Sequence, residues 1–200
     1  MRRIITIASI AAVLALATPH AAAYCLTGVR WTSAANVYYN SSGKVTSGQC
    51  ITSAQLDSAV TGGISPWHAI QYGGTTSAKA NRRDGQNTVG WARLGGGTLG
   101  VTNYLNYGGS SVCGANTFSQ LFEADVRITT VYRWTSTSGQ CPCAAGSAYY
   151  VNAVATHEFG HVIGLCHTNQ PSSLMYPSFG VCENKGKGSD ENAGESATCW

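Results

Sequence analysis

The stretch THEFGHVIGLCHT, residues 156–168, contains three histidines, one glutamate and one cysteine. Each of these side chains can bind a metal ion. His157 and His161 are four residues apart, so on a helix their side chains lie one turn apart on the same face. Two imidazole nitrogens placed in this way can reach one ion at about 2.0 to 2.1 Å. The spacing therefore predicts a metal site on a helix.

The residues around this pair complete the predicted site. Gly164 can adopt the left-handed backbone that ends a helix, which would turn the chain so that His167 approaches the same ion from another direction. Three neutral imidazoles leave the fourth tetrahedral position open for water, as in catalytic zinc sites, whereas structural sites close all four positions with protein ligands. Glu158 would lie beside the metal, where it can accept a proton from that water. We therefore expect one catalytic zinc ion held by His157, His161 and His167.

Cys166 is the remaining group of the stretch that can bind metal. It directly precedes His167, so in an extended segment the two side chains point to opposite sides. A thiolate ligand would also occupy the position that water needs. We expect Cys166 to form a disulfide that anchors the turn before His167, with Cys182 as the candidate partner.

The full motif HExxHxxGxxH is followed after seven residues by MYP at residues 175–177. This combination resembles the metzincin zinc endopeptidases, and within them the matrixin branch, which includes the matrix metalloproteases. The resemblance implies that Met175 is the methionine of the Met-turn, an apolar base beneath the zinc ligands that is not itself a ligand. An ordinary core methionine would be buried in the same way, and only the position of Met175 after the zinc motif favours the first role.

The resemblance extends upstream and covers most of residues 28–179. It implies an α+β metzincin-like zincin fold with a twisted mixed five-stranded sheet, a backing helix and an active-site helix. The same alignment places the edge of the sheet at residues 98–103, where an extended peptide substrate would pair antiparallel. Leu99 and Gly100 would lie nearest the scissile bond, and Pro177 and Phe179 would belong to the wall of the specificity pocket. Ordinary packing is the alternative role for each of them.

Local patterns predict helices and strands at these positions. In residues 52–70, apolar residues recur at helical spacing, and Thr52 with Gln55 fits a capping box. Gly62, Gly63 and Pro66 predict that this helix ends early or bends. A second helix is predicted for residues 147–164, with Gly164 at its end. Aromatic and β-branched runs separated by glycine turns predict strands at residues 37–40, 88–94, 98–107 and 121–129.

From Gly180 onward the sequence has no hydrophobic period and is rich in glycine and polar residues. The C-terminal helix of the matrixins has no periodic counterpart here, so we expect a small loop-rich part held down by Cys182 and Cys199. The eight cysteines are at positions 25, 50, 113, 141, 143, 166, 182 and 199. An even number in an exported chain is typical of disulfides. A cysteine zinc site is the alternative, but CPC at 141–143 has one intervening residue where such sites usually have two to four.

The first residues of the chain resemble a secretory signal peptide. Two arginines precede an apolar run from Ile4 to Ala17, and small residues follow at 21–23. The run is shorter than the roughly 20 residues that a membrane-spanning helix needs. We therefore expect a signal peptide at residues 1–23, one catalytic domain at residues 24–200, a secreted extracellular protein and no membrane anchor.

Charge and composition limit the partners. Removal of Arg2 and Arg3 lowers the formal net charge from +3 to +1, which leaves no basic field for nucleic-acid binding. The expected mature chain has one histidine outside the motif and four aspartates, so we expect no second zinc site, and calcium is unsupported.

Matrixins usually carry an inhibitory prosegment with a zinc-blocking cysteine. Only a few residues separate Ala23 from the first strand, so we expect no such segment and a disulfide at Cys25.

We predict a secreted zinc metalloendopeptidase, acting as a monomer on protein or peptide substrates, in which Glu158 activates a zinc-bound water. One alternative is a non-catalytic secreted binding protein that keeps zinc as a structural staple. The glutamate argues against it, because a staple needs no proton acceptor beside the metal. Another alternative is a metallohydrolase of cell-wall peptide amides, over which the extended edge strand favours protein chains.

Overall fold

The structure, a computed structural model, describes residues 24–136 and 148–200; the expected signal peptide and the CPC segment lie outside them. Its largest sheet contains six strands, which are β2 (Val29–Arg30), β3 (Ala35–Tyr39), β4 (Ile70–Thr75), β5 (Asn87–Ala92), β6 (Gly100–Cys113) and β7 (Asn116–Thr129). Strands β4, β3, β5 and β7 pair in that order, and β7 also pairs with β2 and with β6. β6 pairs antiparallel with β7, and the other pairings are parallel. The sheet is therefore mixed, as predicted, and the two-residue β2 joins it as a sixth strand.

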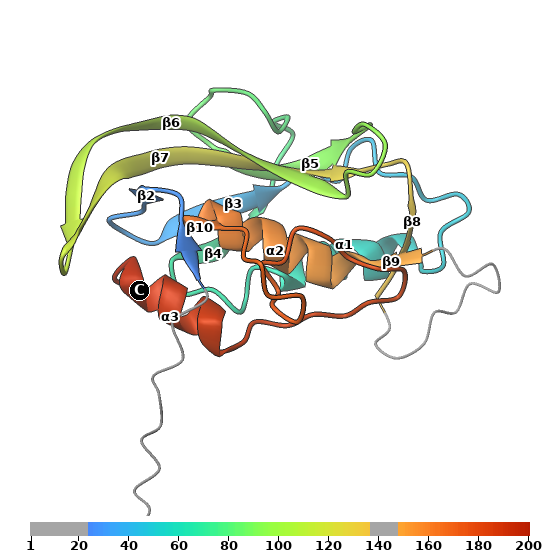
Figure 1. Cartoon of the computed structure of the whole chain (residues 1–200). Helices are drawn as coiled ribbons and strands as arrows, with labels where there is room; N and C mark the ends of the chain where they lie inside the picture. Colours follow the sequence, from blue (N-terminus) through green and yellow to red (C-terminus); the bar gives the residue numbers. More distant parts are fainter. Residues whose placement is uncertain (1–23, 137–147) are drawn as a thin grey trace, which may run out of the picture.

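Helices α1 (Ser53–Gly62) and α2 (Val151–Val162) pack against each other beneath the sheet (Figure 1). The Thr52 hydroxyl accepts a hydrogen bond from the backbone N–H of Gln55, and the Gln55 side chain accepts one from the backbone N–H of Thr52. This is the predicted capping box, and the helix ends early at the glycine pair, also as predicted. The core between these layers includes the buried residues Val37, Val60, Val89, Ile128, Val154 and Phe159.

Strands β6 and β7 form a hairpin that is longer than the sequence predicts, with fourteen residues in each strand. Residues 108–111, GGSS, indicate a turn locally, but β6 continues through them with a register shift, because Gly108 and Ser111 pair with Gln120 and Phe118 of β7. The true turn lies at Gly114, which has φ +57°. The outer part of the hairpin exposes Tyr107 and Val112, so it lacks the alternation that marks a half-buried strand.

The C-terminal tail contains a helix, α3 (Ser189–Ala197), where the sequence predicts loop. The hydrophobic pattern does not predict this helix, because the buried face of α3 carries polar side chains and a glycine. Its buried residues are Glu191, Gly194 and Glu195. Glu195 accepts a hydrogen bond from the backbone N–H of His68 at 2.6 Å and forms an ion pair with Lys187. Polar interactions thus dock this helix, together with the Leu165 side chain, which fills the space next to Gly194.

Two disulfides tie distant parts of the chain together. Cys113 at the tip of the hairpin is bonded to Cys199, just after α3. Cys25 is bonded to Cys166, so the predicted disulfide at Cys166 is confirmed, whereas the candidate partner Cys182 is wrong. Cys182 is disulfide-bonded elsewhere. The pairing could not be read locally because β1 (Cys25–Leu26) and β10 (Leu165–Cys166) meet only in the folded chain.

Two further short strands, β8 (Arg133–Thr135) and β9 (Ala148–Tyr150), pair in parallel, and β9 leads directly into α2. Within the described ranges, every helix is too short or too polar to cross a membrane.

Candidate active site

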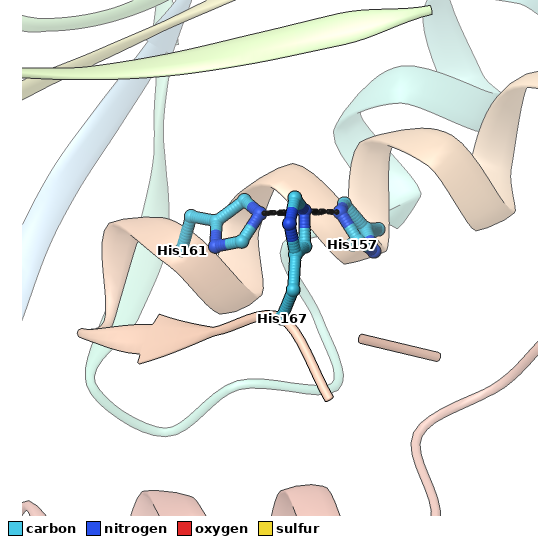
Figure 2. A group of neighbouring side chains, drawn as sticks. All are labelled: His157, His161 and His167. Atoms are coloured by element: carbon cyan, nitrogen blue, oxygen red, sulfur yellow. Dashed lines mark hydrogen bonds between the residues drawn. The ribbon is translucent and has the colours of Figure 1, made fainter. Parts of the chain in front are cut away.

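The three histidines of the motif converge at one point. His157 and His161 lie on α2, and His167 follows β10. Their Nε2 atoms lie 3.1 Å apart for the pairs His161–His157 and His161–His167, and 3.3 Å apart for His157–His167 (Figure 2). Three nitrogens bound tetrahedrally to one zinc ion at about 2.05 Å would be about 3.3 Å apart. The observed spacing therefore fits a single ion.

The backbone fixes which ring nitrogens are free to bind. The Nδ1–H of His157 donates to the Leu174 carbonyl at 2.7 Å, and that of His161 donates to the Leu165 carbonyl at 2.7 Å. A neutral imidazole has one donor and one acceptor nitrogen, so the two Nε2 lone pairs face each other. Two facing acceptors repel unless a cation lies between them. The donor set thus fits a metal ion held by His157, His161 and His167, the one such group among the described residues.

Burial keeps these rings neutral. Burial lowers the pKa of His157 to about 3, and the neighbouring His161 is the second largest cause. Burial lowers the pKa of His161 to about 4, against the opposing hydrogen bond to Leu165. Burial also lowers the pKa of His167. Since only the neutral imidazole binds metal, the site favours its ligand form at neutral pH.

Glu158 points into the same cleft from α2 and is 5% exposed. The Thr102 hydroxyl lies 2.8 Å from Glu158 Oε2 and 2.9 Å from the Glu158 carbonyl oxygen. Burial raises the pKa of Glu158 to about 7, although the hydrogen bond from Thr102 acts in the opposite direction. Gly100 leaves the space that the carboxylate occupies, because a Cβ there would lie 2.5 Å from Glu158 Oε1. The glutamate is therefore enclosed by the first residues of β6.

Gly164 has the left-handed backbone predicted for it, with φ +102°. A Cβ at this position would collide with the Val29 carbonyl oxygen, so both the conformation and the space require glycine. The turn that follows brings β10 and then His167 back toward α2.

Met175 is buried, with 1% of its surface exposed. Its sulfur occupies the space next to Gly160, which lies between the two histidines of α2. The backbone N–H of Met175 donates to the Glu191 carboxylate of α3 at 3.2 Å. The preceding carbonyl, that of Leu174, is the one that orients His157. The turn at residues 173–175 therefore connects the C-terminal helix to the metal ligands.

A cavity of about 260 Å³ opens beside His157 and Glu158. All four residues predicted to contact substrate line it, namely Leu99, Gly100, Pro177 and Phe179. The ring of Phe179 meets that of His157 edge to face at a centroid distance of 5.4 Å. Residues of the predicted pocket wall and of the predicted edge strand thus line the same cavity.

Sequence reasoning missed several residues of this site. Tyr149 and Val154 line the cavity, and Thr102 contacts the glutamate. Lys185 donates to the Ser178 carbonyl at 3.0 Å, and its Nζ lies 5.0 Å from the Phe179 ring centroid, although its side chain is only 5% exposed. Of these residues, only Val154 could have been predicted from local spacing, because it lies one helical turn before Glu158.

Comparisons with known proteins agree with the geometry. The neutrophil collagenase of Homo sapiens is 42% identical over 59 residues, which are 30% of this chain and 11% of the collagenase. Matrilysin of Felis catus is 52% identical over 33 residues, 16% of this chain and 13% of matrilysin. Matrix metalloproteinase-9 of Canis lupus familiaris is 44% identical over 45 residues, 22% of this chain and 6% of that protein. The chain therefore matches at most 13% of the length of these relatives.

A family model described as Matrixin matches residues 32–193, which is most of the chain and includes every residue of the candidate site. The family implies the metzincin fold, with which the mixed sheet and the histidine helix agree. On this match, the chain belongs to the matrixin family.

Proposed function

We propose that this protein is a secreted zinc endopeptidase that hydrolyses peptide bonds in extended protein or peptide substrates. The convergence of the three Nε2 atoms beside a buried glutamate is the observation that carries the proposal. A metal held only as a structural staple would not need Glu158 in the cleft. A zinc ion bound there would supply Lewis acidity, which polarises a carbonyl group and lowers the pKa of water.

Strand β6 would hold the substrate. Among the described residues, β6 pairs only with β7, so its outer edge along residues 100–103 is free to bond an extended peptide. Leu99 and Gly100 are at the start of this edge and line the cavity beside the histidines. A peptide on this edge would pass the metal centre with one side chain in the cavity walled by Pro177 and Phe179.

Glu158 would move the protons of the reaction. Its pKa of about 7, raised by burial, allows it to take a proton from the attacking water near neutral pH. The protonated carboxyl can then deliver this proton to the leaving amine. The Thr102 hydroxyl, 2.8 Å from Oε2, would hold the carboxylate in place during these steps.

The experiment is to compare Glu158→Gln with wild type on casein and on a library of internally quenched peptides. Loss of the proton acceptor should lower kcat at least about 100-fold. Bound zinc, measured by elemental analysis, and the unfolding temperature should remain close to wild type. Asp84→Asn removes an exposed carboxylate in the loop before β5 and serves as the matched control. A zinc chelator should abolish cleavage in wild type.

Retained cleavage by Glu158→Gln would refute this mechanism, and cleavage that survives chelation would refute the metal centre as its source. The secreted form should begin at Tyr24, which N-terminal sequencing of the culture medium would show. An intracellular, uncleaved product would contradict the proposed export.

A further inference from the structure

The N-terminal segment, residues 25–29, lies against the turn that carries the third histidine. Strand β1 pairs antiparallel with β10, with Cys25 opposite Cys166 and Leu26 opposite Leu165. The backbone N–H of Thr27 donates to the Gly164 carbonyl at 2.8 Å, and its hydroxyl donates to the same oxygen at 3.0 Å. The segment therefore pairs with residues 165 and 166 and is hydrogen-bonded to residue 164.

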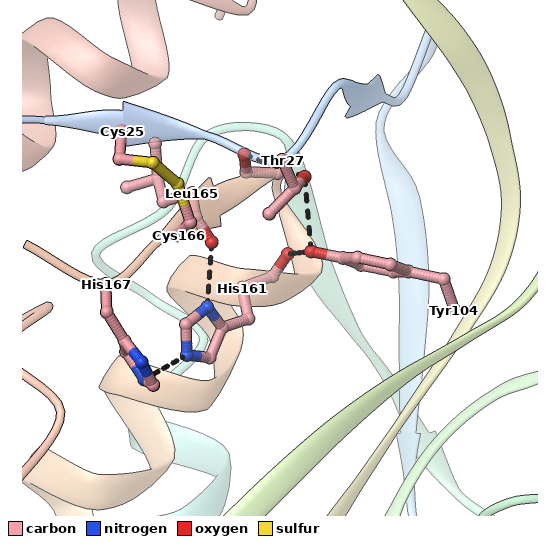
Figure 3. The surroundings of a disulfide bond; sticks show 8 residues. Cys25, Thr27, Tyr104, His161, Leu165, Cys166 and His167 are labelled. Carbon is pink, nitrogen blue, oxygen red and sulfur yellow. Dashed lines mark hydrogen bonds between the residues drawn. A yellow bond between two sulfur atoms is a disulfide. The ribbon is translucent and has the colours of Figure 1, made fainter.

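The disulfide makes this contact covalent. It joins Cys25 to Cys166, the residue directly before His167 (Figure 3). The backbone of the third histidine is thus tied, one residue away, to a part of the chain 141 positions earlier. Because His167 follows β10 and does not belong to α2, its position depends on such contacts more than those of the two helical histidines.

The same segment also contacts the groups that orient His161. Its ring is oriented by the Leu165 carbonyl, and Leu165 is paired with Leu26 of β1. The Tyr104 hydroxyl donates to the His161 carbonyl at 2.6 Å and lies 3.4 Å from the Thr27 hydroxyl. Figure 3 shows Thr27, Tyr104 and Leu165 around His161. Two of the three histidines are therefore held by contacts that include the N-terminal segment.

We propose that the N-terminal segment is a positioning element for the metal centre, which fixes His161 and His167 in the binding geometry and so tightens zinc binding. This inference rests on the metal centre of the proposed function but not on peptide cleavage. Groups that orient metal ligands from behind typically change metal affinity about 10- to 100-fold when they are removed. Loss of the segment's contacts should weaken zinc binding by a factor in this range.

A disulfide can also act only by stabilising the whole fold, and the chain offers a matched control for that effect. The Cys113–Cys199 disulfide joins residues 86 positions apart, against 141 for Cys25–Cys166. A disulfide lowers the conformational entropy of the unfolded chain, and the resulting stabilisation grows only with the logarithm of this separation. The two disulfides should therefore stabilise the fold by similar amounts. Cys113–Cys199, however, links the hairpin tip to the residues just after α3, and neither cysteine is next to a site histidine in the sequence.

The test is to measure zinc affinity by competition with a chromophoric chelator in the purified protein and three variants. Cys25→Ala/Cys166→Ala removes the bond near the site, with alanine at both positions so that no thiol can bind zinc. Cys113→Ala/Cys199→Ala is the control. Thr27→Val keeps both disulfides and the side-chain shape but removes the hydroxyl contact to Gly164.

We expect the Kd for zinc to rise about 10- to 100-fold in Cys25→Ala/Cys166→Ala. In the control it should stay within about twofold, and in Thr27→Val it should rise by a smaller factor, about 3- to 10-fold. Circular dichroism would establish that each variant is folded at the assay temperature. Equal losses of zinc affinity in the two disulfide variants would overturn the proposal. An unchanged Kd in Cys25→Ala/Cys166→Ala would overturn it as well.

If Cys25→Ala/Cys166→Ala does not fold, Thr27→Val decides, and a wild-type Kd in that variant overturns the proposal. Wild-type protein that binds zinc tightly but cleaves no peptide would refute the proposed function alone. The affinity comparison would still stand, because its readout does not require cleavage.

Discussion

Replacing Thr102 with valine should lower the rate of peptide cleavage while leaving substrate binding almost unchanged. The hydroxyl lies 2.8 Å from Glu158 Oε2, and the carboxylate is buried, so water cannot replace the lost contact. A hydrogen bond to a charged group contributes about 1.5 to 3 kcal/mol. If that energy is needed to hold the carboxylate in its reactive position, kcat should fall roughly 10- to 150-fold. KM should stay within about twofold, because the substrate would bond the backbone of β6 and not this side chain.

The assay is initial rates on one quenched peptide over a range of concentrations and pH, with zinc content measured for each variant. Thr102→Ser keeps the hydroxyl and should recover kcat to within about threefold. Removing the hydrogen bond also removes the influence that lowers the pKa of Glu158, so the acid limb of kcat/KM should move to higher pH in Thr102→Val. Valine and serine variants with equal losses would refute the role of the hydroxyl, and so would a kcat within twofold of wild type for Thr102→Val.

Two further predictions concern stability. Gly164→Ala should lower the free energy of unfolding in urea by at least about 2 kcal/mol, because alanine disfavours φ +102° and its Cβ would collide with the Val29 carbonyl oxygen. Gly95→Ala is the control and should change the stability little, because the space around Gly95 is open. Equal losses of stability in the two variants would contradict the role of Gly164. Burial raises the pKa of Glu195, but hydrogen bonds from Lys187 and His68 lower it more, so the folded pKa is below 4.5. Its stabilisation is thus present above pH 4.5 and lost as pH falls below it. Glu195→Gln should cost about 3 kcal/mol at pH 7 and flatten the acid limb of the stability profile; an unchanged acid limb would refute the assignment.

The histidine site shows how far local spacing can predict a structure. Four-residue spacing on a helix places His157 and His161 on one face whatever the rest of the chain does. A glycine at position 164 permits the left-handed turn that brings His167 back. These relations span only eleven residues, so the sequence predicts them without knowledge of the sheet. The contacts that orient the rings were not predictable in this way, because the Leu174 carbonyl lies 17 residues from His157.

The misses in the fold have a common physical cause. The buried face of α3 carries two glutamates and a glycine, and it is stable only because Lys187, His68 and Ser173 meet it in the folded chain. The outer part of the hairpin exposes apolar residues and contains GGSS, yet it is a strand because its partner strand is there. In each case the stabilising partner lies outside the element itself, so the pattern of residues along that element does not indicate it.

The amino-acid sequence by itself determined the metal-binding motif, the helix that carries it, the capping box at Thr52 and the mixed sheet implied by the resemblance. The motif, its helix and the capping box depend on spacing within a few turns of one element. The mixed sheet was implied only by the resemblance that the motif carries. Only the tertiary structure decided that Cys25 pairs with Cys166, that Thr102 holds the glutamate, and that a polar C-terminal helix lies behind the Met175 turn. The reason is that disulfide pairing and side-chain contacts between strands and helices are set by which segments meet in space, and sequence separation carries almost no information about that.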